Sequence, residues 1–551
     1  MTKPSLTLGH TKAGEPYTTT ARDRTTHTHV VGLSGKGKSK FIESLVRQDI
    51  TDPNEPGVMV MDPHGALYDA ILAWCAEIGI GEDGHRKLHL INPSEQKYSF
   101  GFNPLHSDPN VSPFTRIDLM VDAFAQVWGG EDTSKTPRLK RCLRAIFFVL
   151  VSKGYTLLEA KQLITYGESD VRAMFTEGLD SPIYQLEWDE LNSLQERNFI
   201  EMFESTNNRL LEFLTQPTIC NILGQRNNTI NFKECMDNGD IVLVNLKNND
   251  FFSEANALLL GRLLLNDIRA SAMTREPMEG DTHHSPFYVY VDECHDYLNG
   301  DVRRMLPQTR KFGVHLTLIH QELGQLHDAG EGIASAVLSG AQTKVIFGGM
   351  LMEDCKELAE NIFASTINLE EGVESSKRNI VVGDYIDIVR GQSKTSGYTE
   401  SNMTGESTST PFGEGAESYT SLSNEGSSYT SSTSHSEQEV VRSKWDEVYT
   451  DRWSLQEQIF KYGAALKDQP QQHIVVKLPN DPPVHLMTEW IGEALIESEF
   501  VNQYEHYLLE HDQFVRLQAD VQDEILGRHK QLLEATIVGS EDSEDGFLVD
   551  G

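Results

Sequence analysis

The stretch THTHVVGLSGKGKSKFIESLVRQ (26–48) decides the fold. It begins with an apolar run typical of a buried strand and continues into 32–39, which matches the phosphate-loop pattern GxxxxGK(S/T) in full. The residues after the loop suit a helix, so strand, loop and helix follow in the order that phosphate binding needs. A chance glycine-rich turn is the alternative. The direction of Lys36, towards solvent or towards a phosphate, stays open.

The glycines, the lysine and the serine of this loop are candidates for binding a nucleotide. Gly32, Gly35 and Gly37 let backbone N–H groups turn inward around a phosphate at the positive end of a helix. We expect Lys38 to reach the β- and γ-phosphates and the Ser39 hydroxyl to hold Mg²⁺. The loop therefore predicts ATP and Mg²⁺ as cofactors.

A second motif, FYVYVDE (287–293), is an apolar strand that ends in two carboxylates. We expect Asp292 to bind Mg²⁺ through its water shell. Glu293 is expected to polarise the water that attacks the γ-phosphate. An ordinary acidic strand end is one alternative. DECH (292–295) also resembles the DExH box of superfamily-two helicases, but no Ser-Ala-Thr motif follows it.

Short runs of β-branched and aromatic residues alternate with helical stretches over much of the chain. Continuous apolar runs spaced by helices predict an α/β fold with a mainly parallel sheet covered on both faces. The expected strands lie at 26–31, 57–61, 87–91, 240–246, 287–291, 314–319 and 344–348. Between 112 and 235 apolar residues recur at helical spacing, which predicts an all-helical insertion.

Composition excludes several classes of protein. The 551 residues are 38% hydrophobic and 24% charged, which excludes wholesale disorder and a single small fold. The net charge of −36 repels polyanions, so any contact with nucleic acid must be local. The 6 cysteines are scattered, without a CxxC pair or matching histidine spacing, and suggest neither a zinc knuckle nor a disulfide framework. With no long apolar run and no signal-peptide pattern, we expect a cytoplasmic protein without a membrane anchor.

Composition and periodicity also divide the chain. The stretch 391–440 is rich in Ser, Thr and Gly and repeats SYTS, which predicts a flexible insertion, with a ribbon ordered against a partner as the alternative. We expect an N-terminal segment (1–26), a first core part (27–111), the helical insertion (112–235), a second core part (236–370), the low-complexity insertion (371–444), a core completion (445–489) and a helical C-terminal appendage with an acidic tail (490–551).

Several motifs occur together and in a fixed order. After the phosphate loop come VMVMDPHG (58–65), FNPL (102–105), the strand ending in Asp-Glu, TRKFGVHLTLIHQ (309–321) and FKYGAALKDQPQQHIVVKLP (460–479). This ordered set resembles the HerA/FtsK superfamily of ring ATPases. Within that superfamily it is most similar to type IV secretion (conjugative) coupling proteins and their soluble, HerA-like DNA-translocating relatives.

The resemblance implies a RecA-like P-loop NTPase core and a homo-hexameric ring that threads DNA and holds ATP between subunits. It implies that Arg310 is an arginine finger donated to a neighbour's γ-phosphate, and that Gln321 senses that phosphate. A solvated cation and a strand-end polar residue are the respective alternatives, and Arg303 or Arg304 are other candidate fingers. Asp62 is either a further contact to the metal or its water, or the residue that forms the Asp-Pro-His-Gly turn.

A cluster of bases is the densest positive patch in the sequence. At helical spacing several of its members share one face, where they would neutralise DNA phosphates without reading sequence. Salt bridges to neighbouring carboxylates are the alternative in so acidic a chain. The bases are Lys135, Arg138, Lys140, Arg141 and Arg144.

These observations favour an ATP-hydrolysing ring motor that binds DNA without sequence specificity and translocates it. Two alternatives stay open. One is an ATPase scaffold or switch that assembles with an effector, such as a nuclease in antiphage defence. The other is a soluble coupling ATPase of conjugative transfer with a secretion-system partner. The sequence contains no nuclease or zinc signature, so any cutting activity must come from another chain.

Overall fold

The computed structural model describes residues 4–82, 86–106, 112–129, 137–275, 284–298, 302–364, 386–392, 435–441 and 454–544. The chain forms two compact units, one of 1–367 with 456–551 and one of 368–455. In the second unit, β11 (Ile386–Gln392) pairs antiparallel with β12 (His435–Val441). The rest of the expected low-complexity insertion (371–444) lies outside the described residues.

The first unit is built on an eleven-stranded sheet with the order β2-β1-β14-β13-β10-β3-β9-β8-β4-β7-β5. From β10 to β5 all neighbouring strands are parallel. These strands are β3 (Thr28–Val31), β4 (Gly57–Asp62), β5 (Leu88–Ile91), β7 (Ile241–Asn245), β8 (Phe287–Val291), β9 (Val314–His320) and β10 (Thr343–Phe347). Each overlaps a strand expected from the sequence, so the predicted α/β fold with a mainly parallel sheet is confirmed.

Four antiparallel strands extend the sheet beyond β10. They are β1 (Pro4–His10), β2 (Pro16–Thr20), β13 (His473–Lys477) and β14 (Val484–Met487). β13 pairs with β10, β14 with β13, and β1 with both β14 and β2. The expected N-terminal segment (1–26), for which the sequence predicted no strand, thus supplies the edge strand β2 and its neighbour β1.

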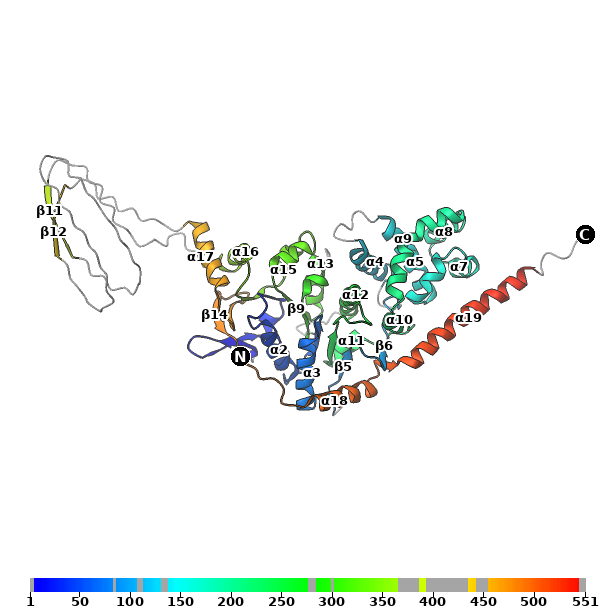
Figure 1. Cartoon of the computed structure of the whole chain (residues 1–551), viewed down its shortest axis with the longest axis horizontal. Helices are drawn as coiled ribbons and strands as arrows, with labels where there is room; N and C mark the ends of the chain where they lie inside the picture. Colours follow the sequence, from blue (N-terminus) through cyan, green and yellow to red (C-terminus); the bar gives the residue numbers. More distant parts are fainter. Residues whose placement is uncertain are drawn as a thin grey trace, which may run out of the picture. The chain divides into compact units, whose positions relative to one another are not determined.

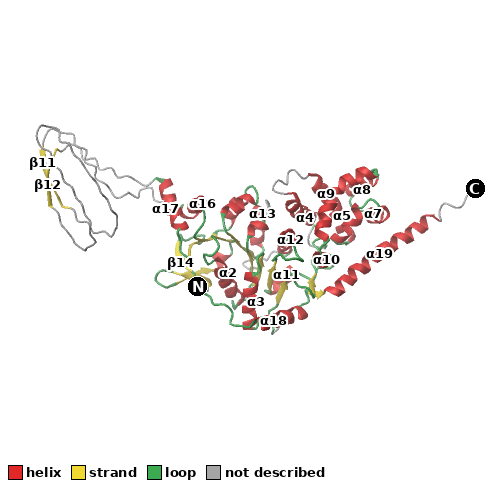
Figure 2. Cartoon of the chain, viewed as in Figure 1, coloured by secondary structure: helices red, strands yellow, loops and turns green. Residues whose placement is uncertain are grey.

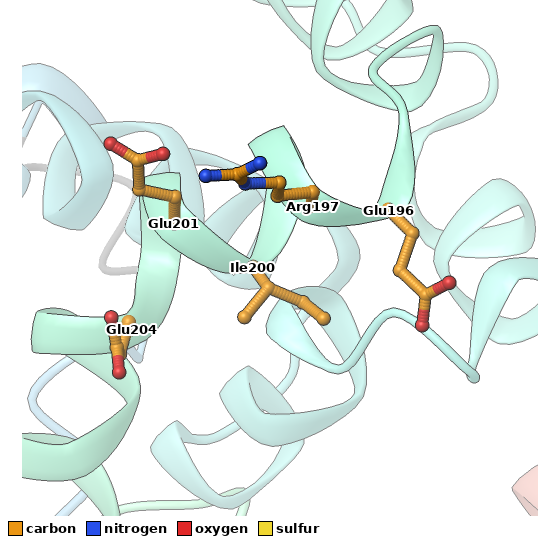
Figure 3. A pocket seen from close by; sticks show the side chains of 5 residues that line it. All are labelled: Glu196, Arg197, Ile200, Glu201 and Glu204. Carbon is orange, nitrogen blue, oxygen red and sulfur yellow. The ribbon is translucent and has the colours of Figure 1, made fainter.

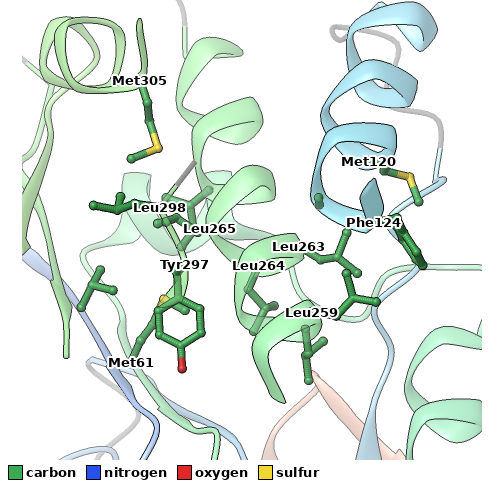
Figure 4. Packing of buried hydrophobic residues seen from close by; sticks show 14 of the residues in the cluster. Met61, Met120, Phe124, Leu259, Leu263, Leu264, Leu265, Tyr297, Leu298 and Met305 are labelled. Carbon is green, nitrogen blue, oxygen red and sulfur yellow. The ribbon is translucent and has the colours of Figure 1, made fainter. Parts of the chain in front are cut away.

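Successive residues of a strand point to opposite faces of the sheet, and both faces are buried. On β4, Val58 and Val60 pack in one apolar cluster, whereas Met59 and Met61 pack in the other. Helices α2 (Lys38–Ile50), α3 (Ala66–Ile78) and α18 (Ser498–His511) cover the first face (Figure 1). Helices α12 (Glu254–Met273) and α13 (Val302–Lys311) cover the second. Figure 4 shows leucines of α12 between Met61 of the sheet and Phe124 of α4 (Pro113–Gly129).

Between β6 (Tyr98–Phe100) and β7 every described element is helical (Figure 2). Trp188, Phe199 and Phe203 are fully buried there and form the centre of an aromatic core. The helices after α4 are α5 (Pro137–Lys153), η2 (Leu157–Glu159), α6 (Ala160–Ile164), α7 (Ser169–Thr176), α8 (Pro182–Asn192), α9 (Glu196–Leu214), α10 (Pro217–Leu223) and α11 (Phe232–Asn238).

The C-terminal part joins the core to these helices. α18 packs on α3 and β5, β15 (Val515–Leu517) pairs antiparallel with β6, and α19 (Gln518–Glu544) follows. The sequence predicted helices here but not β15. In the described part of the chain no helix has the length and apolar character needed to cross a membrane. The remaining helices are α1 (Ala21–Arg24), η3 (Cys294–Asp296), α14 (Leu323–Asp328), α15 (Ile333–Gly340), α16 (Met352–Phe363) and α17 (Leu455–Lys467).

Candidate nucleotide site

The phosphate loop connects β3 to α2 with a backbone that requires glycine. Gly32 has a φ of 156°, and a Cβ atom there would lie 2.3 Å from Cβ of Phe347 on β10. Gly37 has a φ of 104° and caps the amino end of α2 in the left-handed region. The close approach to Phe347 thus requires glycine at position 32, and the left-handed backbone requires it at position 37.

The first residues of α2 lie where a phosphate would meet them. Lys38 is buried, and its Nζ donates a hydrogen bond of 3.0 Å to the carbonyl oxygen of His320 at the end of β9. Burial lowers the pKa of Lys38, and the carboxylates of Glu293 and Asp292 oppose that shift. Ser39 is exposed on the first turn of α2. Both side chains therefore lie beside the loop, with the lysine charge close to the carboxylates that follow β8.

The Lys36 side chain points neither to solvent nor towards a phosphate, which were the two directions that the sequence left open. Its Nζ donates to the carbonyl oxygen of Gln469 at 3.0 Å, and its own carbonyl accepts from the Gln472 backbone N–H at 2.9 Å. Both partners lie between α17 and β13. The loop is therefore tied to the antiparallel extension of the sheet, a contact that the motif alone could not reveal.

Glu293 directly follows Asp292 after β8 in a strained conformation. Its φ of 44° and ψ of 49° are left-handed for a residue that is not glycine, and such strain is concentrated at functional sites. Gln321 Nε2 donates to Glu293 Oε1 at 2.6 Å. Within the described residues, Glu293 Oε2 is buried and has no hydrogen-bond partner. One carboxylate oxygen is thus held in place while the other is free to accept a proton or to polarise water.

The electrostatics around these carboxylates suit a cation. Burial raises the pKa of Asp292 to about 6, with Lys38 lowering it and Glu293 and Asp62 raising it further. Mg²⁺ prefers oxygen ligands and is commonly bound by one or two carboxylates together with phosphate oxygens. Around Asp292, the charge of Lys38 is opposed by the carboxylates of Glu293 and Asp62. The residues present therefore fit a divalent cation beside the phosphate loop.

Asp62 is close to this cluster, but its carboxylate has another use. Oδ1 accepts from the His64 N–H at 2.8 Å, and Oδ2 accepts from the N–H groups of Leu67 at 2.7 Å and Tyr68 at 2.9 Å. Both oxygens therefore hold the turn into α3. Of the two roles considered from the sequence, this geometry matches turn formation.

Arg310 is not brought to the phosphate loop of its own chain. It is exposed at the carboxyl end of α13, where β9 starts, whereas Gln321 follows the other end of β9. A strand of 7 residues at about 3.3 Å per residue separates the two ends by roughly 20 Å. Arg303 and Arg304 are exposed in the first turn of α13.

Two histidines that sequence reasoning did not select flank Glu293. His64 Nε2 lies 3.8 Å from Glu293 Oε1, and His295 Nδ1 lies 3.5 Å from Oε2. His64 is mostly exposed and His295 mostly buried. Both belong to motifs described above, His64 to Asp-Pro-His-Gly and His295 to Asp-Glu-Cys-His. Their positions in these motifs were the sequence signal that could have identified them as site residues.

Three members of the predicted basic patch are paired with carboxylates in the structure. Lys140 pairs with Asp122 at 3.0 Å, Arg141 with Glu187 at 2.8 Å and Arg144 with Asp118 at 2.8 Å. The remaining described member, Arg138, donates to the Glu201 carbonyl oxygen, and Lys135 lies outside the described residues. These pairings match the alternative of salt bridges to neighbouring carboxylates.

A surface hollow elsewhere on the helical region is acidic. Figure 3 shows that α9 lines it with Arg197 and Ile200 among three glutamates, Glu196, Glu201 and Glu204. A surface with three carboxylates and one guanidinium repels phosphates. This hollow therefore does not suit a nucleic acid.

The parallel sheet, the phosphate loop and the carboxylates after β8 together define a P-loop ATPase fold of the RecA-like class. No family model matches the chain, and no curated protein matches its sequence. Among solved structures, the bacterial conjugative coupling protein TrwB in its unbound form matches with a TM-score of 0.53 and 14% identity over 90% of each chain. TrwB in complex with a non-hydrolysable ATP analogue matches with a TM-score of 0.50 and 14% identity over 89% of this chain and 91% of that one. The expected resemblance to coupling proteins is thus confirmed at the level of the fold.

Proposed function

We propose that the chain is an ATP-hydrolysing ring motor of the HerA/FtsK type, a homo-hexamer that binds and translocates DNA. Three lines support the nucleotide chemistry: the complete phosphate loop, the cation-compatible carboxylates beside it, and the shared fold with TrwB, which was solved with an ATP analogue. The motor function rests further on the ordered set of family motifs.

In this proposal each residue has a distinct task. Lys38 and the loop N–H groups bind the phosphates, while Ser39 and Asp292 hold Mg²⁺, which neutralises charge on the phosphate oxygens. Glu293 polarises the attacking water through Oε2 while Gln321 fixes Oε1 at 2.6 Å. Because Gln321 contacts Glu293 directly, a phosphate that moved Gln321 would also move the catalytic carboxylate.

The placement of Arg310 carries the proposal of a ring. About 20 Å of strand separates it from the Glu293 side of the sheet, which is beyond the reach of an arginine side chain. A second copy of the chain, packed with its α13 against the first copy's phosphate loop, would supply the missing positive charge. Such a finger stabilises the charge that develops in phosphoryl transfer and makes hydrolysis depend on assembly.

A mixing experiment tests the shared site. Arg310→Ala and Glu293→Gln subunits should each hydrolyse ATP slowly while binding it normally. When they are mixed under conditions of subunit exchange, some interfaces unite an intact Arg310 with an intact Glu293, so turnover should partly recover.

Lys311→Ala is the matched control, because it removes an exposed charge from the next position of the same helix. It should hydrolyse ATP at the wild-type rate. Full activity of Arg310→Ala alone would remove this residue from the mechanism and direct attention to Arg303 and Arg304.

One observation favours a second candidate function. Three described members of the densest positive cluster are paired with carboxylates, which reduces the positive charge that this cluster could offer to DNA. An ATPase switch that assembles with an effector, or a soluble coupling ATPase with a protein partner, requires no such surface. Hydrolysis that duplex or single-stranded DNA accelerates favours the motor. Hydrolysis that ignores DNA but responds to a partner protein favours the switch.

A further inference from the structure

Three buried side chains with metal-binding atoms meet on the far side of the sheet from the phosphate loop. His89 lies in β5, Cys235 in α11, and Asp240 immediately before β7. Their exposed fractions are 2%, 0% and 4%. One ligand atom from each lies within 4.8 Å of the other two. This cluster, here called the His-Cys-Asp cluster, plays no part in the nucleotide site.

One ring nitrogen of His89 is held by a carboxylate, and the other is not satisfied. Nδ1 contacts the Asp512 carboxylate at 2.8 and 3.0 Å, and the ring stacks on Phe514 with centroids 4.0 Å apart. Nε2 is buried without a hydrogen-bond partner in the described part of the chain, since the nearest oxygen of Asp240 is 3.6 Å away. A buried polar atom left unpaired costs roughly 1–3 kcal/mol. Nε2 therefore lacks a partner at the point where the sulfur and the carboxylate meet it.

This arrangement is the one that histidine ligands of metals usually show. A ligating histidine typically gives its second ring nitrogen to a carboxylate, which fixes the tautomer and the ring orientation. Asp512 is the carboxylate that contacts the second ring nitrogen of His89, and Phe514 fixes the plane of the ring. A hollow lined by His89, His511 and Asp512 adjoins this imidazole.

The donor set selects the class of ion. Imidazole nitrogen, thiolate sulfur and carboxylate oxygen together suit Zn²⁺ and similar borderline cations. Mg²⁺ and Ca²⁺ prefer oxygen ligands and would leave the sulfur unused. We propose that His89 Nε2, Cys235 Sγ and Asp240 bind one divalent ion of the zinc class, with water in the fourth position.

The ion would join three segments distant in sequence. It would link the edge strand β5 to α11, which leads out of the helical region, and to the start of β7. Through Asp512 it would also fix the link between α18 and β15. Binding of the ion would thus stabilise the junction between the sheet, the helical region and the C-terminal part.

A cationic histidine is the competing explanation. Although burial alone would lower the pKa of His89, the carboxylates of Asp240 and Asp512 raise it above its ordinary value. An imidazolium between two carboxylates would need no metal. In that case the thiol of Cys235, whose pKa burial and Asp240 raise, stays protonated and is a bystander.

Cobalt substitution distinguishes the two explanations on the full-length chain. We expect the protein, stripped of metal by chelation, to take up one Co²⁺ per chain and to show tetrahedral d–d absorption with a thiolate-to-cobalt charge-transfer band. Zn²⁺ should displace the cobalt and abolish both signals. Cys235→Ser should lose the charge-transfer band. Cys75→Ser, which alters an equally buried cysteine of α3 outside the cluster, should keep it.

Asp512→Asn provides a variant that keeps all three ligands. Weakening the contact that orients His89 should reduce Co²⁺ affinity by about 10–100-fold without removing the band. Absence of the band in the wild-type protein at stoichiometric Co²⁺ would overturn the proposal and support the imidazolium. A band that persists in Cys235→Ser would also overturn it. Both readouts are independent of ATP hydrolysis.

Discussion

A buried ion pair joins the phosphate-loop helix to β8, the strand that Asp292 and Glu293 follow. Two guanidinium nitrogens of Arg24 contact the two carboxylate oxygens of Asp49 at 2.5 and 2.6 Å. Asp49 lies in α2 and also accepts from the Tyr290 hydroxyl of β8 at 2.6 Å. The guanidinium lies 3.4 Å from the centre of the Tyr288 ring. Both charged groups are buried, so each depends on the other.

We predict that Asp49→Asn destabilises the core by about 3–5 kcal/mol, the usual cost of removing one partner of a buried pair. The amide keeps the shape of the carboxylate but leaves the Arg24 charge uncompensated. It also weakens the charge-assisted hydrogen bond from Tyr290. Because the pair ties α2 to β8, hydrogen exchange of α2 should accelerate as well.

Urea denaturation, with hydrogen exchange to locate the affected elements, measures this effect. A chain of 551 residues need not unfold in one step, so the comparison concerns the transition in which α2 loses protection. The triple variant Arg24→Met, Asp49→Leu and Tyr290→Phe is the control, because it removes both charges together with the hydroxyl that donates to Asp49, and it should recover most of the loss. A loss below about 1 kcal/mol in Asp49→Asn would refute the reasoning, since that is the size expected of a solvated pair.

Three further predictions follow from particular contacts. Gly32→Ala should abolish ATP binding in a titration, because its Cβ would meet Phe347 at 2.3 Å. Gly35→Ala should also weaken binding, but less, because its Cβ meets nothing within 4 Å and only its φ of 79° is strained for alanine. Wild-type affinity in Gly32→Ala would contradict this reasoning. Arg528→Met should release α19 from the helical region and expose it to limited proteolysis, because Arg528 Nε donates to buried Glu159 at 2.7 Å; an unchanged cleavage pattern would contradict this. Deleting 393–437 should leave ATP turnover within about twofold of the wild-type rate, because the entropic cost of closing a loop changes little with the length of an insertion. Loss of assembly in this variant would instead indicate that the insertion acts between subunits.

The parallel core and its carboxyl edge could be predicted because their signals are local. Each strand was a continuous apolar run, and the phosphate loop and the Asp-Glu pair each lie within a few residues. Since parallel strands end at one edge, a sequence that places Lys38, Glu293 and Gln321 after such strands also brings them together. The contact from Gln321 to Glu293 follows from that topology.

What sequence reasoning missed depends on contacts between distant segments. The pairing of β1 with β14 joins strands from the two ends of the chain, each of which also pairs with its sequence neighbour, so no local signal predicts it. The His-Cys-Asp cluster escaped because His89 and Cys235 are far apart in sequence and meet only through sheet packing. The basic residues of α5 can be recognised in the sequence as a cluster. The carboxylates of α4 and α8 that pair with them cannot, because they belong to other helices.

The rate of ATP hydrolysis by Glu293→Gln at saturating ATP and Mg²⁺ tests the central claim most directly. The amide retains an oxygen for the hydrogen bond from Gln321 but loses the basic Oε2, which is buried without a hydrogen-bond partner among the described residues. Loss of a group that polarises the attacking water should lower turnover by about 10²–10⁴-fold while ATP affinity stays at the wild-type level. Turnover close to that of the wild-type protein, in a variant that folds and binds ATP, would show that Glu293 is not the catalytic carboxylate.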